Sequence, residues 1–231
     1  MNIRGIQKTS LIDYPGAIST VLFTGGCNLR CSYCHNPSLA YNDCNLHYYS
    51  NEEVIDLLRS RKHLIGAVVL TGGEPTIAKG ILQFLENIKS LGMKIKLDTN
   101  GFQPDILKKI IIKNLVDYVA IDIKTSPQKY SLLTKTKLSF NCIKESIRLL
   151  KDFDIQFEVR TTCVPEFVTL EDLHSIKEQI GQVSHYYLQQ FNNDHTMDED
   201  LHRVKPYPEE ILLLFRQFVQ TFATYCDIRG L

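Results

Sequence analysis

The chain has 231 residues, in which 26 lysines and arginines balance 26 aspartates and glutamates. A net charge of zero excludes the broad positive field that binding to nucleic acid or anionic membranes usually needs, so we expect neither partner. Apolar residues make up 44% of the chain, which is enough for one sizeable core, and we expect a single domain over residues 1–231.

The N-terminal residues lack the apolar region of a signal peptide, and no apolar run approaches the roughly 18 residues of a membrane span. We therefore expect a cytoplasmic protein. The chain has seven cysteines, and in the cytoplasm they favour reduced thiols at a metal centre over disulfides. Three isolated thiols are expected to be ordinary core or surface residues: Cys142, Cys163 and Cys226.

Apolar, β-branched runs alternate with helix-like segments, a pattern that predicts parallel strands joined by crossover helices. The predicted strands are 17–23, 67–70, 94–97, 118–123, 156–161 and 185–188. Ser50 and Glu53 form a predicted capping box at the start of the first helix. Further helices are predicted over 81–91, 104–113, 140–150, 170–180 and 208–224.

Six strand and helix units are too few to close an eight-stranded barrel. The sequence therefore predicts an α/β fold of the partial (β/α)6 TIM-like barrel type, with a parallel sheet and an open cleft at the strand C-termini. A doubly wound sheet is the main alternative.

Cys27, Cys31 and Cys34 directly follow the first predicted strand, with Cys-x3-Cys-x2-Cys spacing. A [4Fe-4S] cluster normally takes four protein thiolates, so a local trio indicates a cluster with one iron open to another ligand. The alternative is a structural zinc site completed by His35 or Cys44, because zinc accepts mixed cysteine and histidine ligands.

Two motifs in chain order carry a resemblance to a known family. The cysteine loop, with Tyr33 before its last cysteine, resembles the signature of the radical S-adenosylmethionine superfamily, and Gly72-Gly73-Glu74-Pro75 resembles its second motif. The resemblance runs from about Ile6 to Phe191 and is closest to the short anaerobic ribonucleoside-triphosphate reductase activating proteins among the glycyl-radical-enzyme activases. The stretches that carry this narrower resemblance are 9–16, 33–37, 97–102 and 121–124.

The resemblance implies that Cys27, Cys31 and Cys34 bind three irons of a [4Fe-4S] cluster whose fourth iron binds S-adenosyl-L-methionine. Reductive cleavage of this cofactor then yields methionine and a 5'-deoxyadenosyl radical. The implied partners are a glycyl radical enzyme, anaerobic ribonucleotide reductase in particular, and an electron donor of the flavodoxin or ferredoxin type.

The resemblance also implies contacts to the cofactor. Gly72 and Gly73 would let the backbone approach its methionine amino group and Glu74 would accept a hydrogen bond from it, whereas an ordinary glycine turn is the alternative. Tyr33 would place its backbone near the adenine or pack over the loop. We expect His35 and Asn36 to shield the cluster without a catalytic role.

Asp98 and Thr99 end the third predicted strand, and Asp122 and Lys124 end the fourth. Oxygen atoms at neighbouring strand ends can bind a hard cation. In pyruvate formate-lyase activating enzyme, which these motifs resemble, the matching residues bind a monovalent cation and the lysine contacts the cofactor. The alternative for Asp98 is an Asx turn.

Two further residues are candidate contacts to the cofactor. Arg160 ends the fifth predicted strand, where it could bind a carboxylate or ribose, or form an ordinary salt bridge. The stretch Leu188-Gln-Gln-Phe191 stands where pyruvate formate-lyase activating enzyme has a histidine. Gln190 is therefore the expected ribose or adenine contact, and His185 and His195 are expected to be structural or exposed.

Two other functions remain open at this level. One is a radical enzyme acting on a small molecule, such as the 7-carboxy-7-deazaguanine synthases, although these tend to place Asp-Thr where this chain has His35-Asn36. The other is a non-enzymatic iron-sulfur or zinc protein, which would need neither the motif Gly72-Gly73-Glu74 nor the charged strand ends.

Overall fold

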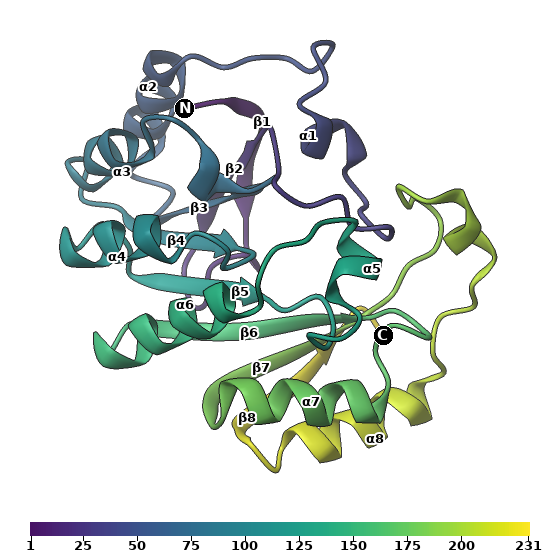
Figure 1. Ribbon diagram of the computed structural model, residues 1–231. Coiled ribbons are helices and arrows are strands. Elements are labelled where there is room, and N and C mark those ends of the chain that lie inside the picture. The colour runs from purple at the N-terminus through teal and green to yellow at the C-terminus, as the bar shows by residue number, and fades with distance from the viewer.

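One eight-stranded sheet organises the computed structural model of the chain, which describes residues 1–231 (Figure 1). The strands lie in chain order, with β1 antiparallel to β2 and all later neighbours parallel. Their bounds are β1 (Ile3–Ser10), β2 (Ser19–Thr24), β3 (Ala67–Gly72), β4 (Lys94–Thr99), β5 (Tyr118–Asp122), β6 (Gln156–Cys163), β7 (Val183–Gln190) and β8 (Ala223–Arg229).

The longer helices cover the outer face of the curved sheet, whereas α1, α5 and the segment around η2 lie at the end where the parallel strands terminate (Figure 1). The helix bounds are α1 (Pro37–Tyr41), α2 (Asn51–Arg61), α3 (Ile81–Lys89), α4 (Pro104–Ile112), α5 (Tyr130–Thr134), α6 (Asn141–Asp152), α7 (Leu170–Ile180) and α8 (Glu209–Val219), with short 3₁₀ turns η1 (Pro75–Ile77) and η2 (Glu199–Arg203).

The predicted partial barrel is confirmed, and the six predicted strands correspond to β2–β7. The capping box is also present, because the Glu53 amide donates to Ser50 Oγ and the Ser50 amide donates to the Glu53 carboxylate. Two strands were missed. The last helix ends at Val219 rather than at residue 224, because residues from Ala223 onward pair with β7 as β8.

Two apolar clusters hold the sheet. The larger one fills the space between the sheet and its helices, with Leu22, Leu70 and Leu97 fully buried. The smaller one lies on the other face of the sheet and contains Tyr14, Val21, Ala67, Val69 and Tyr118. Because side chains alternate along a strand, residues next to those in the larger cluster point into the barrel. No helix is both long and apolar enough to cross a membrane, and the cytoplasmic location stays a prediction.

Candidate active site

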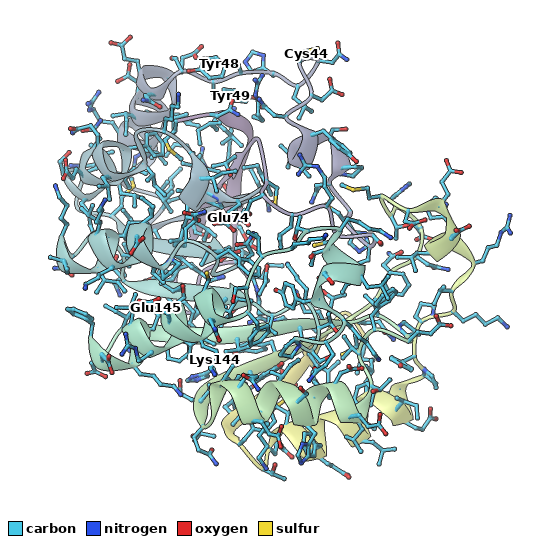
Figure 2. All side chains as sticks on the ribbon, viewed as in Figure 1. Cys44, Tyr48, Tyr49, Glu74, Lys144 and Glu145 are labelled. Carbon is cyan, nitrogen blue, oxygen red and sulfur yellow. The ribbon has the colours of Figure 1, made fainter.

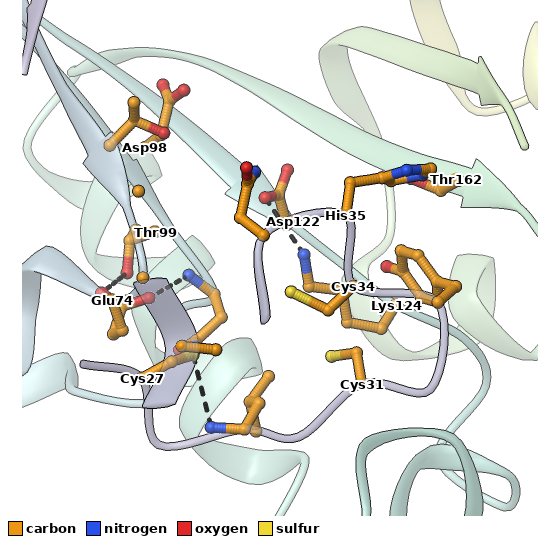
Figure 3. Close-up of a pocket in the computed structure, with 18 of the residues that line it drawn as sticks. Cys27, Cys31, Cys34, His35, Glu74, Asp98, Thr99, Asp122, Lys124 and Thr162 are labelled. Carbon is orange, nitrogen blue, oxygen red and sulfur yellow. Dashed lines mark hydrogen bonds and ion pairs between the residues drawn. The ribbon is translucent and has the colours of Figure 1, made fainter. Parts of the chain in front are cut away.

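The three motif cysteines face a cavity of about 330 Å³ at the carboxyl ends of the strands. Their loop follows β2, and three backbone bonds fix its path: Arg30 N donates to Thr134 O, Ser32 N to Leu133 O, and Cys34 N to Cys31 O, each at 2.9 Å. In Figure 3 the side chains of Cys31 and Cys34 lie next to Lys124. The loop therefore presents its thiols to the polar strand ends.

The chemistry of these thiols fits a cluster. Burial raises the pKa of Cys27 to about 11 and that of Cys31 to about 12, so iron must displace a proton from each thiol to bind the thiolate. The Leu29 amide, 3.4 Å from Cys27 Sγ, supplies the kind of backbone donor that stabilises a bound thiolate.

The zinc alternative finds no support in this geometry. No three histidine, cysteine, aspartate or glutamate side chains come together as ligands of a single ion, the three motif thiols included. His35 lines the cavity, but Cys44 is exposed on a segment at the periphery, away from Glu74 (Figure 2). Separated thiols on one loop suit a cluster, in which each thiolate binds a different iron.

The two glycines of the second motif make a close backbone approach. Gly72 has a φ of +110°, a conformation that side chains disfavour, and a Cβ on Gly73 would lie 2.0 Å from the Gly26 oxygen. Gly73 N donates to Thr24 O and Glu74 N to Gly26 O, both at 2.8 Å. The glycines thus join the second motif to the cysteine loop, and both line the cavity.

Glu74 is only 1% exposed, and its carboxylate ties the end of β3 to the end of β4. One oxygen accepts from Thr99 Oγ1 at 2.7 Å and from Thr76 N at 3.0 Å, and the other accepts from Asn100 N at 2.7 Å. Burial raises the pKa of Glu74, and these donors act in the opposite direction. Glu74 lines the cavity, as a residue that contacts the cofactor must. The contact itself stays a prediction.

We expect Glu74→Gln to keep the cluster but to lose both stability and affinity for S-adenosylmethionine. The amide nitrogen of glutamine must face either the Thr76 or the Asn100 backbone N–H, and one unpaired buried donor costs about 1–3 kcal/mol. The unfolding midpoint, the cluster spectrum and the cofactor affinity measure the effect. Wild-type stability together with wild-type affinity would contradict this role.

A chain of alternating charges crosses the ends of β4, β5 and β6. Arg160 bridges two carboxylates, with Nη1 3.1 Å from Asp98 Oδ2 and Nε 2.6 Å from Asp122 Oδ1. Lys124 Nζ lies 3.2 Å from Asp122 Oδ2, the pair joined by a dashed line in Figure 3. Burial alone would raise the pKa of Asp122, but Arg160 and Lys124 hold it below its ordinary value. Burial would likewise lower the pKa of Lys124, but Asp122 raises it well above its ordinary value.

The predicted monovalent cation at Asp98 and Asp122 stays a prediction. A cation there would share these oxygens with Arg160 and Lys124, and Lys124 lies beside Asp122 as expected. We expect potassium or sodium to raise the affinity of the wild type for S-adenosylmethionine, and we expect this effect to vanish in Asp122→Asn because the variant lacks the second carboxylate. Titrations in a large organic cation, with and without added potassium, measure it. A wild type indifferent to both ions would remove the cation from the site.

The structure brings almost all of the predicted site residues into one cavity. Only Gln190 lies outside it, because its side chain donates to Tyr207 O and accepts from the Phe191 amide. The adjacent Gln189 lines the cavity instead. The predicted residues in the cavity lining are Cys27, Cys31, Tyr33, Cys34, Gly72, Gly73, Glu74, Asp98, Thr99, Asp122, Lys124 and Arg160.

Six residues of the cavity lining had no role predicted from the sequence: Leu29, Ala40, Thr71, Asn100, Thr162 and Gln189. A signal for Gln189 exists in the strand pattern. Tyr186 and Leu188 are fully buried against the helices, so alternation places Gln189 on the barrel side, where it pairs in register with Thr162. Asn100 lies inside the recognised stretch 97–102, but no role was assigned to it.

The fold and the site together define an α/β-barrel enzyme in which a three-cysteine loop shares one cavity with a glycine turn and charged strand ends. The chain belongs to the radical S-adenosylmethionine superfamily, because the family model described as the Radical SAM superfamily matches residues 21–180. Its cofactors are a [4Fe-4S] cluster and S-adenosyl-L-methionine.

Three named proteins are similar in sequence. One from Methanocaldococcus jannaschii, named as a candidate glycyl-radical enzyme activating enzyme, is 34% identical. The match covers 90% of the present chain and 87% of the relative. A pyruvate formate-lyase-activating enzyme from Clostridium pasteurianum is 31% identical, covering 71% and 68%. A 7-carboxy-7-deazaguanine synthase from Rhodopirellula baltica is 29% identical, covering 64% and 57%.

The fold has solved counterparts. The crystal structure of SuiB from Streptococcus suis superposes with a TM-score of 0.68 at 15% identity and covers 91% of this chain. The present chain spans about half of SuiB, since the match covers 48% of it. At this identity the likeness shows the fold alone.

Proposed function

We propose that the chain is a glycyl-radical-enzyme activase, with anaerobic ribonucleoside-triphosphate reductase as its partner. The observation that carries the proposal is the 34% identity to a candidate activating enzyme over nearly the whole of both chains. The match to pyruvate formate-lyase-activating enzyme supports the same activity. When bound, the reduced cluster supplies one electron that cleaves S-adenosylmethionine to methionine and a 5'-deoxyadenosyl radical, which takes a hydrogen atom from the substrate.

The residues of the cavity have defined tasks in this proposal. Cys27, Cys31 and Cys34 hold the cluster, and the Gly72-Gly73-Glu74 turn holds the cysteine loop against β3. Lys124 and Arg160 supply positive charge for the cofactor carboxylate, because both line the cavity and are held by Asp122. The chain therefore orients the cofactor and leaves the bond cleavage to the cluster.

The proposed substrate is a glycine in a mobile C-terminal loop of the larger partner enzyme. A glycine has no side chain, so its Cα can approach the 5' carbon closely, and hydrogen transfer yields 5'-deoxyadenosine and a glycyl radical. The net charge of zero gives little long-range attraction, so we expect weak association that depends only mildly on salt. A flavodoxin- or ferredoxin-type protein is the proposed electron donor.

The test mixes the reconstituted protein with an anaerobic ribonucleotide reductase, S-adenosylmethionine and dithionite, and records the electron paramagnetic resonance spectrum. The expected result is a doublet glycyl radical signal, with Cys31→Ala as the matched control that gives none. Formation of 5'-deoxyadenosine without a reductant-dependent radical on any candidate reductase would contradict the proposed partner.

A second candidate is a radical enzyme that acts on a pterin, favoured by the similarity to 7-carboxy-7-deazaguanine synthase. Turnover of a free pterin, with no glycyl radical in the same preparation, would select it. A non-enzymatic iron-sulfur protein would form no 5'-deoxyadenosine in either assay.

A further inference from the structure

A second group of charges lies next to the cavity: Lys96 and Glu158 are buried inside the barrel, and Arg229 reaches Glu158 from the last strand with 38% of its side chain exposed. It consists of Lys96 on β4, Glu158 on β6 and Arg229 on β8, none of which lines the cavity. Glu158 is fully buried and the Lys96 side chain is only 3% exposed. Because a barrel interior of this fold is usually filled by branched apolar side chains, charges here need a specific explanation.

These charges are continuous with the cavity. Lys96 Nζ lies 3.1 Å from Asp98 Oδ1 and 3.8 Å from Glu158 Oε1. Arg160 Nη1 lies 3.1 Å from Asp98 Oδ2 and 3.9 Å from Glu158 Oε1. These four ion pairs form a closed ring of alternating charge that consists of Lys96, Asp98, Arg160 and Glu158. Two of its members, Asp98 and Arg160, line the cavity.

Arg229, on the last strand, binds the Glu158 member of this ring from outside it. Its two terminal nitrogens lie 3.1 and 3.2 Å from the two oxygens of Glu158, and its guanidinium carbon lies 3.4 Å from the centre of the Tyr187 ring. Tyr118 donates a further hydrogen bond to Glu158 at 3.1 Å. The stacked, two-bonded arginine fixes Glu158 in place.

Lys96 is anchored by a sequence motif that the proposed function leaves unexplained. Its ammonium donates to the Asp13 carbonyl at 2.9 Å, and Asp13 lies in the stretch 9–16 between β1 and β2. The hydroxyl of Ser10 in turn bonds to the Asp13 carboxylate at 2.5 Å and accepts from the Asp13 amide. This loop thus orients the lysine of the ring through the backbone carbonyl of Asp13.

The position of Arg160 depends on competition among the carboxylates around it. Arg160 has three carboxylates within reach, at 2.6 Å for Asp122, 3.1 Å for Asp98 and 3.9 Å for Glu158. A buried carboxylate without a counter-charge attracts any mobile cation strongly. As long as Arg229 neutralises Glu158, Arg160 stays paired with Asp98 and Asp122, which line the cofactor cavity.

We propose that Glu158 and Arg229 are positioning residues for the S-adenosylmethionine site, and that Arg229 keeps Arg160 between Asp98 and Asp122 by satisfying Glu158. The last strand is in this way coupled to the cofactor cavity. Without Arg229, Glu158 attracts Arg160 and Lys96 toward itself, and Asp98 loses these two cations as ion-pair partners.

The test compares the affinity of cluster-loaded variants for S-adenosylmethionine by calorimetry. We expect Arg229→Gln to weaken binding about tenfold, within the usual range for changes along a coupled network. The double variant Glu158→Gln/Arg229→Gln should bind more tightly than Arg229→Gln alone, because the competing carboxylate is gone. The change that the cofactor causes in the spectrum of the reduced cluster should be altered in Arg229→Gln and restored in the double variant.

Lys89→Gln is the matched control, since it removes a part-buried ion pair with Asp117 that lies outside the cavity. It should lower the unfolding midpoint and leave cofactor affinity unchanged. If Arg229→Gln does not fold, Arg229→Lys takes its place, with about fivefold weaker binding expected because an ammonium lacks the planar fork. An affinity within twofold of wild type in the single variant, or a double variant that binds no better than it, would overturn the proposal.

Discussion

Replacing Cys31 with alanine is expected to abolish the [4Fe-4S] cluster and, with it, all cleavage of S-adenosylmethionine. The cavity supplies only three thiols, each expected to bind a different iron, and no further cysteine lines it to take over. The buried Cys31 side chain is small, so its truncation should cost on the order of 1 kcal/mol of folding stability. Loss of the cluster would therefore not reflect loss of the fold.

Iron and sulfide analysis, the visible absorption of the cluster and the far-ultraviolet circular dichroism measure these outcomes together. Cys142→Ala is the matched control, because Cys142 is a part-buried thiol on α6 outside the cavity. It should retain the full cluster. A full cluster in Cys31→Ala, or its loss in Cys142→Ala, would refute the assignment of the ligands.

The sequence allowed most of this site to be predicted because its residues belong to short motifs at strand ends. Parallel strands bring their carboxyl ends to one edge, so the sequence alone places Glu74, Asp98 and Asp122 in one cleft. The cysteine spacing is local in the same way. Chemistry carried by contiguous residues is therefore readable from the sequence.

Two charged residues escaped prediction because their role depends on long-range pairing. Glu158 and Arg229 are 71 residues apart, and neither lies in a recognised motif. Their contact depends on β8 joining the sheet beside β7, and the sequence analysis extended the preceding helix to residue 224 and predicted no strand after it. Arg229 was consequently invisible as a partner of the barrel interior.

The structure adds a second reason for the two glycines. The sequence suggested that they let the backbone approach the cofactor, and this stays a prediction, since both line the cavity. The structure also shows them against the backbone that leads into the cysteine loop. Both reasons require small residues, so the residue type alone could not reveal the second, which depends on the tertiary neighbour of Gly73, the Gly26 carbonyl.

This neighbour makes Gly73→Ala the other substitution with a large expected effect. The new Cβ would lie 2.0 Å from the Gly26 oxygen, and because both atoms are backbone-fixed, the two motifs must move apart. We expect a loss of about 3 kcal/mol or more in folding stability, at the upper end of overpacking effects. Gly26 directly precedes Cys27, so the same movement should displace the first cluster ligand and lower the iron content.

Gly66→Ala supplies the control for this substitution. Gly66 directly precedes β3, the strand that Gly73 follows, and a Cβ on Gly66 would have no atom within 4 Å. Its φ lies in the ordinary range for side-chain-bearing residues, so alanine should be neutral or stabilise by up to about 1 kcal/mol through the unfolded chain. Chemical unfolding and iron analysis of both variants decide the matter. If Gly73→Ala matches Gly66→Ala in stability and iron content, the close approach of the two motifs is not what this glycine provides.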